Sequence, residues 1–309
     1  MKRELKDYAI IALKGVAMGA ADVVPGVSGG TIAFISGIYD ELIHSIDSFN
    51  LKNLKLLKTA GFLAAFKAIN GSFLLSLFVG IGFSVLTLAN VFKYLLETHP
   101  ILVWSFFFGL VLASIVFIAK QITKWNVLNV FLLLIGAGIA YYITIIPAMG
   151  SGENSPLFLV LAGALAICAM ILPGISGAFI LLLLGAFKPA LDAIHNHDYK
   201  SIAFLGIGAV VGLLSFAKVL KWLFVNFKNG TLAILTGFVI GSLNKIWPWK
   251  ETLKSVVIGG KERVLQEKSI SPFAVENNHL VIALVLAVIG FSLILLLEKL
   301  GNKKINKQK

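Results

Sequence analysis

Two copies of one short motif of Pro, Gly and Ser carry the clearest chemical signal in this sequence. Residues 24–29 have the sequence VPGVSG, and residues 172–177 have the sequence LPGISG, 148 positions later. Pro and Gly interrupt helices, and a Ser that follows them is a good N-cap for a helix that begins again. The first backbone N–H groups of such a helix lie at its positive dipole end, which is the chemistry of a phosphate or carboxylate site.

The residues that we expect to contact an anion belong to these two motifs or directly follow the first. Glycine lets a ligand approach the backbone, and Ser and Thr hydroxyls can donate hydrogen bonds. A single copy would also fit a tight turn with a satisfied cap. Two copies in apolar stretches favour binding, because freed backbone is tolerated there only if it lines a cavity or binds a ligand. The predicted substrate-binding residues are Pro25, Gly26, Ser28, Gly29, Gly30, Thr31, Pro173, Gly174, Ser176 and Gly177.

Two ionisable residues near the motifs are candidates for coupling or gating. Asp22 is the only acid between residues 8 and 39, and it could carry a proton or hold a coupling cation. It could equally cap a helix or form a structural hydrogen bond at the break. Its counterpart in the second copy is Met170. Lys188 could meet an anion at the outer mouth, or its ammonium could reach the membrane surface along an apolar stem.

Motifs of known catalytic and metal sites are missing from the sequence. It has no HExxH, Walker or GxSxG motif and no clustered set of carboxylates, so we expect a non-enzyme with no catalytic residues and no cofactor. His195 and His197 stand in a short polar connector, where a solvated loop is the better interpretation than a metal site.

The elements that hold the motifs are expected to lie in a membrane. Hydrophobic residues make up 58% of the chain and charged residues 14%, and the mean hydropathy is +0.91. These values predict an all-α integral membrane protein. The formal net charge of +12 comes from dispersed lysines, which fits contact with anionic membrane lipids and not with nucleic acid. The predicted transmembrane helices are 73–96, 101–119, 127–147, 202–224, 231–246 and 279–298.

The chain divides into two similar halves, residues 1–150 and 151–309. Residues 91–114 match residues 219–242 without a gap, and Gly80-Ile81-Gly82 matches Gly206-Ile207-Gly208. Each half is therefore predicted to contain a broken helical hairpin followed by three transmembrane helices. The hairpins are residues 8–46 and 156–194.

The distribution of Lys and Arg predicts the orientation of the halves. Both ends of the chain are basic and are expected in the cytoplasm, whereas residues 147–156 contain no Lys or Arg and are expected outside. Each half then crosses the membrane an odd number of times, which makes the repeats inverted. A re-entrant hairpin gives that count, and so does a hairpin that spans fully; the central Pro-Gly favours the re-entrant form. Residues 245–268 conflict with this topology, because they are basic and would lie outside.

Two strings around the motifs resemble a known bacterial family. Residues 14–43 (KGVAMGAADVVPGVSGGTIAFISGIYDELI) and 171–194 (ILPGISGAFILLLLGAFKPALDAI) closely resemble PopT-type undecaprenyl-phosphate translocases, long catalogued as a domain of unknown function. The resemblance covers essentially the whole chain. It implies a multi-pass protein of the bacterial cytoplasmic membrane that flips undecaprenyl phosphate, a polyprenyl-phosphate lipid, from the outer to the cytoplasmic leaflet for cell-envelope synthesis.

The residues themselves indicate only an inverted-repeat transporter with an anion site at paired helix breaks. A transporter or channel for a small soluble anion is therefore one alternative, and a membrane lipid phosphatase is another. A lateral opening between helices would favour the lipid, and a closed aqueous vestibule would favour the small anion. The oligomeric state and the coupling ion are left open by the sequence.

Overall fold

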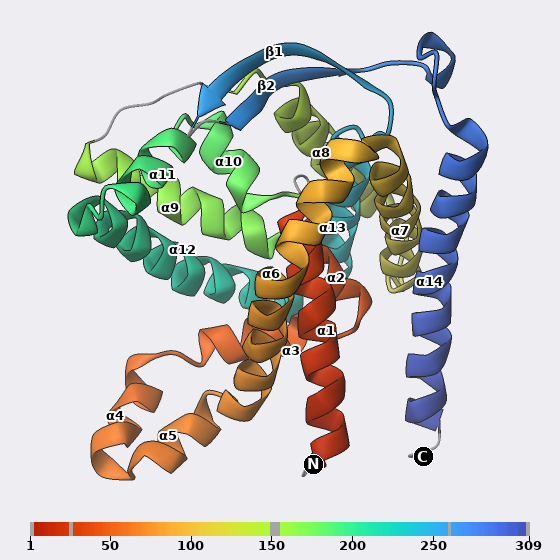
Figure 1. The fold of residues 1–309 in the computed structure, drawn as a ribbon. Helices are drawn as coiled ribbons and strands as arrows, with labels where there is room; N and C mark the ends of the chain where they lie inside the picture. The colour runs from red at the N-terminus through yellow and green to blue at the C-terminus, as the bar shows by residue number, and fades with distance from the viewer. Residues whose placement is uncertain (1–2, 25–26, 149–154, 259–260, 307–309) are drawn as a thin grey trace.

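The chain is mostly helical, with a single described β-hairpin (Figure 1). The computed structural model describes residues 3–24, 27–148, 155–258 and 261–306. The elements in these ranges are α1 (Leu5–Val23), α2 (Gly29–Ile35), α3 (Tyr39–Asp47), α4 (Leu51–Thr59), α5 (Phe62–Ala68), α6 (Gly71–Thr98), α7 (Pro100–Lys120), α8 (Val127–Ile145), α9 (Pro156–Ile171), α10 (Gly177–Leu183), α11 (Phe187–His195), α12 (Tyr199–Asn226), α13 (Lys228–Ser242), β1 (Lys250–Ile258), β2 (Lys261–Ser269), a 3₁₀ turn (Pro272–Ala274) and α14 (Leu280–Asn306).

Four described helices are long and apolar enough to cross a membrane, namely α6, α7, α8 and α12. They correspond to four of the six predicted transmembrane helices. A fifth candidate is the pair α10 and α11, which is bent by 104°. The predicted span 231–246 is present as α13, but α13 has only 15 residues. At about 1.5 Å per residue it is shorter than a hydrocarbon core of roughly 30 Å.

Both predicted helix breaks occur where the Pro-Gly motifs stand. We call residues 24–28 the first break and residues 172–176 the second break. The first separates α1 from α2, and the second separates α9 from α10. A glycine with positive φ then turns the chain again in each case, Gly37 (φ 71°) between α2 and α3 and Gly185 (φ 75°) between α10 and α11. Each motif therefore lies inside a segment of one longer helix followed by two short ones.

Close helix pairs meet at glycines in both halves. On α1 and α6, a Cβ at Gly15 would collide with the Leu77 carbonyl, and α9 and α12 have the same arrangement at Gly163 and Leu205. Small residues let backbones approach this closely.

The glycines of α6 and α12 that pack on α1 and α9 correct the sequence alignment in which Gly80 was matched with Gly206. Gly80 packs on the Ala12 carbonyl, and its structural equivalent is Gly208 on the Val160 carbonyl, not Gly206. The alignment of α6 with α12 therefore keeps the 128-residue offset of the 91–114 match. The reason is that a glycine is required only where the helix faces its partner closely, so only Gly80 and Gly208 are equivalent in their contacts.

Two further helix pairs connect the halves to each other. Helix α7 packs against α14, and α8 packs against α13. Gly109 lies against Ala287 in the first pair, and Gly237 lies against Leu133 in the second. Each of these pairs joins a helix of residues 1–150 to a helix of residues 151–309, so the two parts are interlocked.

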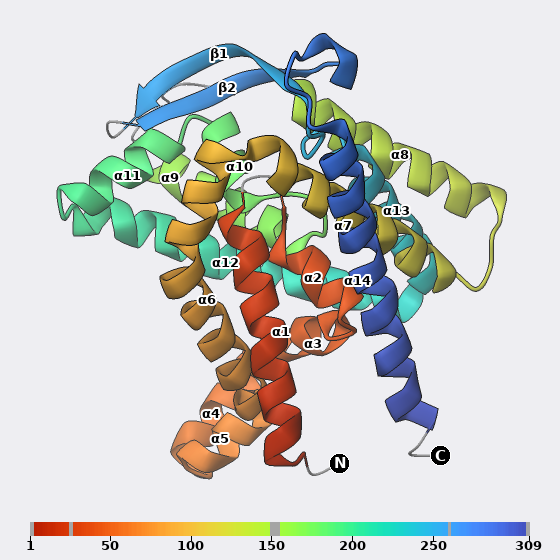
Figure 2. The same cartoon turned by 45° about the vertical axis from the view of Figure 1, so that its right-hand side comes forward.

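The basic segment 245–268 is mostly a β-hairpin, which the helical prediction did not contain. Strands β1 and β2 pair antiparallel, with Lys250 opposite Ser269 and Ile258 opposite Lys261. Strand β1 contains Thr252, Val256, Val257 and Ile258, and β-branched residues suit an extended backbone. The hairpin lies at the end of the molecule opposite to the first residues of α1 and the last residues of α14 (Figures 1 and 2). The N–H of Ala148, just after α8, donates a 3.0 Å hydrogen bond to the Leu265 carbonyl.

Candidate functional site

The two breaks lie against each other and share hydrogen bonds. The Ser28 hydroxyl lies 3.3 Å from the Met170 carbonyl oxygen and 3.2 Å from that of Leu172, so its single proton can be donated to either. The backbone N–H of Gly174 donates to the Thr31 hydroxyl oxygen at 2.9 Å. These bonds satisfy backbone groups that the second break leaves without helical partners.

The first motif is buried and its hydroxyls are occupied by the protein itself. Ser28 and Thr31 are each 1% exposed, and Ser28 also accepts a 3.1 Å hydrogen bond from the Gly30 N–H. A Cβ at Gly30 would collide with the Ile171 carbonyl. The four predicted binding residues from Ser28 to Thr31 therefore hold the breaks together in this conformation. Pro25 and Gly26 lie outside the described residues.

Asp22 is positioned at the start of α2. Its Oδ1 accepts a hydrogen bond from the Gly29 N–H at 2.7 Å. A Cβ at Gly29 would collide with the same carboxylate, so glycine is required for this approach. The geometry is that of a side chain that caps the helix after the break.

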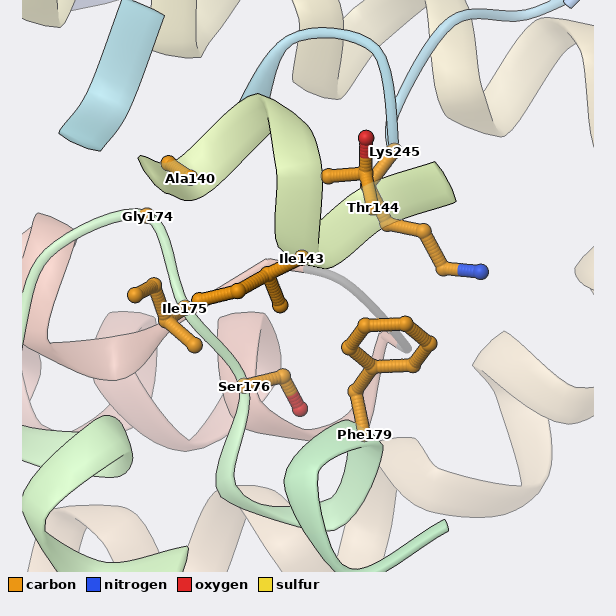
Figure 3. A pocket seen from close by; sticks show the side chains of 8 residues that line it. All are labelled: Ala140, Ile143, Thr144, Gly174, Ile175, Ser176, Phe179 and Lys245. Carbon is orange, nitrogen blue, oxygen red and sulfur yellow. The ribbon is translucent and has the colours of Figure 1, made fainter. Parts of the chain in front are cut away.

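The second motif, in contrast, lines a small pocket that is partly open to the surroundings. Figure 3 shows the Ser176 side chain and the Phe179 ring on one side of this opening, with the Lys245 side chain extending above the ring. The Ser176 hydroxyl makes no capping hydrogen bond to α10. The lining residues are Ala140, Ile143, Thr144, Gly174, Ile175, Ser176, Phe179 and Lys245. A hydroxyl and an ammonium thus face an otherwise mostly apolar space.

The remaining residues predicted from the second motif do not line this pocket. Pro173 and Gly177 are buried, and a Cβ at Gly177 would collide with the Ala166 carbonyl. Lys188, the predicted gating residue, is exposed on α11 and does not line the pocket.

Lys245, Thr144 and Phe179 line the pocket although the sequence did not place them in the site. Phe179 could have been found as the counterpart of Thr31, because it occupies the same position after its motif. Lys245 follows α13, far from Ser176 in sequence, and no local pattern connects the two. Its Nζ lies 2.9 Å from Glu267 Oε2 and 4.5 Å from the centroid of the Phe179 ring, a cation–π contact.

The charged groups above the pocket are themselves partly buried. Glu267 also lies 3.5 Å from the Nζ of Lys250. Burial lowers the pKa of Lys250 to about 8, although the attraction of Glu267 opposes that shift. Burial opposes ionisation of Glu267, but the two lysines together hold its pKa below the usual value. Among the described residues, no group of three or more His, Cys, Asp or Glu side chains could hold a metal ion.

The short helices that follow the two breaks differ in burial. All seven residues of α2 are buried, whereas in α10 only Gly177 is buried. Helix α2 packs against α7 and α9 as well as α1, and α3 packs against α12. Helix α10 packs mainly against α9, and α11 against α12. Helix α3 is thus docked on α12 of the other half of the chain (Figure 2), and α2 packs mainly on its own half but also contacts α9. The second pair is docked on its own half.

Comparison with known proteins places this arrangement in a family. A family model described as undecaprenyl phosphate translocase-like matches residues 18–264, a range that includes both breaks and the pocket. The chain belongs to this family. The resemblance seen in the two sequence strings is therefore confirmed.

Two relatives match over most of their length. A protein of Vibrio cholerae serotype O1, named polyprenyl-phosphate transporter, is 46% identical over 309 residues, which is 98% of this chain and 100% of the relative. A protein of Staphylococcus aureus with the same name is 33% identical over 254 residues, 76% of this chain and 85% of the relative. No solved structure matches the chain.

Proposed function

We propose that this protein flips a polyprenyl phosphate, undecaprenyl phosphate in bacteria, across the cytoplasmic membrane and so returns the lipid carrier for cell-envelope synthesis. The observation that carries the proposal is the pocket at the second break. It combines the Ser176 hydroxyl and the Lys245 ammonium with apolar walls such as Ile143 and Ile175. A phosphate head needs hydrogen-bond donors and a cation, whereas the attached chain needs apolar surroundings. The names of both relatives agree with this substrate class.

The two halves are proposed to be inverted repeats, residues 1–150 and 151–309, each with a re-entrant segment around its break. The equivalent glycine contacts in α1–α6 and α9–α12 support this relationship. So does the exchange of partners, in which α7 packs against α14 and α8 against α13.

The two pairs of short helices pack differently, and we take this asymmetric arrangement to be one state of a transport cycle. Inverted repeats commonly exchange conformations during alternating access. The docked pair α2–α3 would then undock while α10–α11 docks on the first half. By the 148-residue offset, Ser176 would then meet the carbonyls of Asp22 and Val24, and the first motif would bind the phosphate. This assigns Ser28, Gly29, Gly30 and Thr31 to one side of the membrane and Gly174, Ser176 and Gly177 to the other.

The cytoplasmic side is proposed to be the end where α1 begins and α14 ends. Helices α4 and α5 lie at the same end (Figure 1) and carry Lys52, Lys55, Lys58 and Lys67. Cytoplasmic segments are enriched in Lys and Arg, and anionic lipids would attract them. The β-hairpin and the pocket beside it then face outwards, where the substrate phosphate begins its transfer.

The proposal is tested with the purified full chain in liposomes that contain fluorescent undecaprenyl phosphate. After a membrane-impermeant, irreversible quencher has removed the outer-leaflet label, the protein should speed the loss of the remaining inner-leaflet label over the rate in empty liposomes, because only label that has crossed the membrane becomes accessible. Uptake of inorganic phosphate without lipid movement would replace the proposal with a small-anion transporter. Release of inorganic phosphate from the lipid would replace it with a phosphatase.

A further inference from the structure

Three charged side chains above the pocket form a cluster with an unbalanced charge. Lys245 and Lys250 share the single carboxylate of Glu267, at 2.9 Å and 3.5 Å. The Lys250 side chain is 10% exposed, its Nζ lies 4.4 Å from the centroid of the Trp104 ring, and it donates to the Lys245 carbonyl. With both lysines protonated, the cluster carries one net positive charge at the rim of an apolar pocket.

Lys245 is the member of the cluster that reaches the pocket. It lines the opening together with Ser176, and its ammonium has three N–H donors. One donor is used by Glu267, and the face of Phe179 lies next to the same ammonium. Lys250 points elsewhere, towards Trp104, and fixes the backbone of Lys245 through its carbonyl. The cluster therefore presents a single cation to a ligand.

We propose that Lys245 receives the phosphate of the substrate at this pocket and that Glu267 is the carboxylate which the phosphate displaces from it. This inference rests on the proposed transport of a polyprenyl phosphate and adds the residue pair that governs its capture and release. A phosphate monoester carries about −1.5 to −2 charges near neutral pH, against −1 for a carboxylate, so it competes well for one ammonium.

Glu267 also has a second role: it keeps Lys245 in an ion pair when no ligand occupies the pocket. Lys245 is 18% exposed and Glu267 is 23% exposed. Leaving a partly buried ammonium without a partner is costly, and a waiting carboxylate removes that cost when the phosphate departs. Glu267 is thus a positioning residue that makes binding weaker and release easier. A transporter needs both, because a site that binds too tightly does not turn over.

The first experiment measures binding of farnesyl phosphate, a short polyprenyl phosphate, to the full chain in nanodiscs by calorimetry. Lys245→Met keeps the length and the contact with Phe179 but removes the charge, and it should weaken binding at least roughly tenfold. Lys245→Arg should retain most of the affinity. Lys268→Met, which removes an exposed lysine from the adjacent β-hairpin, is the matched control and should bind as the wild type does.

The second experiment tests displacement of Glu267. Glu267→Gln keeps the shape and removes the competing charge, so it should bind farnesyl phosphate several-fold more tightly and release it more slowly. In the Lys245→Met background the same change should have no effect on affinity, which a merely structural role of Glu267 would not predict. Glu251→Gln removes an exposed carboxylate of the same hairpin and is the control. Unchanged or weaker binding in folded Glu267→Gln would overturn the displacement.

The outcomes also separate this inference from the transport proposal. If the wild type neither binds farnesyl phosphate nor moves undecaprenyl phosphate, the proposed function itself fails. If it does both and Lys245→Met binds equally well, transport stands and Lys245 is not the receiving residue. If farnesol or inorganic phosphate bound as tightly as farnesyl phosphate, the pocket would not be specific for a phosphate attached to a lipid chain.

Discussion

The backbone N–H of Gly174 donates a 2.9 Å hydrogen bond to the hydroxyl of Thr31, which lies 143 residues earlier in the chain. The bond joins α2, which follows the first break, directly to the second break. Gly174 has a φ of 89°, a conformation that favours glycine, so the turn that presents this N–H depends on the residue type. The predicted binding motifs therefore also form one of the contacts between the two halves.

Replacing Thr31 with Val should destabilise this contact. Val has a similar shape but no acceptor, so the Gly174 N–H would lose its partner, at a cost of about 1 kcal/mol. The thermal unfolding midpoint of the purified chain should fall. Thr31→Ser keeps the hydroxyl and should unfold close to the wild type; an equal fall in both variants would argue that lost methyl packing is responsible.

The two motif serines should respond differently to removal of the hydroxyl. Ser28→Ala loses buried hydrogen bonds to Gly30 and to the second break, so it should lower stability. Ser176→Ala should leave stability nearly unchanged and weaken binding of farnesyl phosphate by about 1.5–3 kcal/mol, the range for a hydrogen bond to a charged group. Calorimetry and thermal unfolding on both variants measure the two effects. Wild-type lipid binding in Ser176→Ala would reduce Ser176 to a turn residue.

Asp22→Asn tests whether Asp22 couples transport to protons or another cation. The Asn side chain still offers an oxygen to the Gly29 N–H, which Asp22 binds at 2.7 Å, so the fold should persist. Lipid flipping in liposomes should no longer respond to an imposed ion or proton gradient, while equilibrium binding of the lipid phosphate remains. A wild-type gradient response in Asp22→Asn would leave Asp22 as the cap of α2 alone.

The docked state of α3 should depend on the ion pair between Lys221 and Asp47. The Nζ of Lys221 lies 2.6 Å from Asp47 Oδ2, and this bond joins α12 to α3. Lys221→Met should shift the equilibrium towards undocking, so a cysteine at the fully buried Ala33 of α2 should be labelled faster in a Cys168→Ala background. Lys218→Met, an exposed lysine on the same helix, is the control. An unchanged labelling rate would separate this ion pair from the motion.

Single cysteines can test the proposed orientation. In the Cys168→Ala background, a cysteine at position 152 should react with an impermeant reagent added outside intact cells, and a cysteine at Lys6 should react only after the membrane is opened. The reverse pattern would place the β-hairpin in the cytoplasm. Labelling of both cysteines from the same side would contradict the inverted-repeat topology, because the first half would then cross the membrane an even number of times.

Much of the local structure follows from local sequence patterns. Both helix breaks lie at the Pro-Gly motifs because proline removes a backbone donor and clashes with the preceding turn. The helices α6, α7, α8 and α12 follow from long uncharged stretches. The β-hairpin was missed, because its residues alternate weakly in a segment whose most visible property is charge. The predicted span 231–246 is displaced along the chain, since α13 begins at Lys228 and ends at Ser242.

The sequence by itself determined that this is a helical membrane protein with paired helix breaks, and it indicated the family. Those properties depend on composition and on residues close together in the chain. Only the tertiary structure decided that Ser28 and Thr31 bind the opposite break, while Ser176 faces a pocket beneath Lys245. A hydroxyl can serve a ligand or the protein's own backbone with the same chemistry. Which of the two it serves depends on how distant helices pack, and no local spacing encodes that.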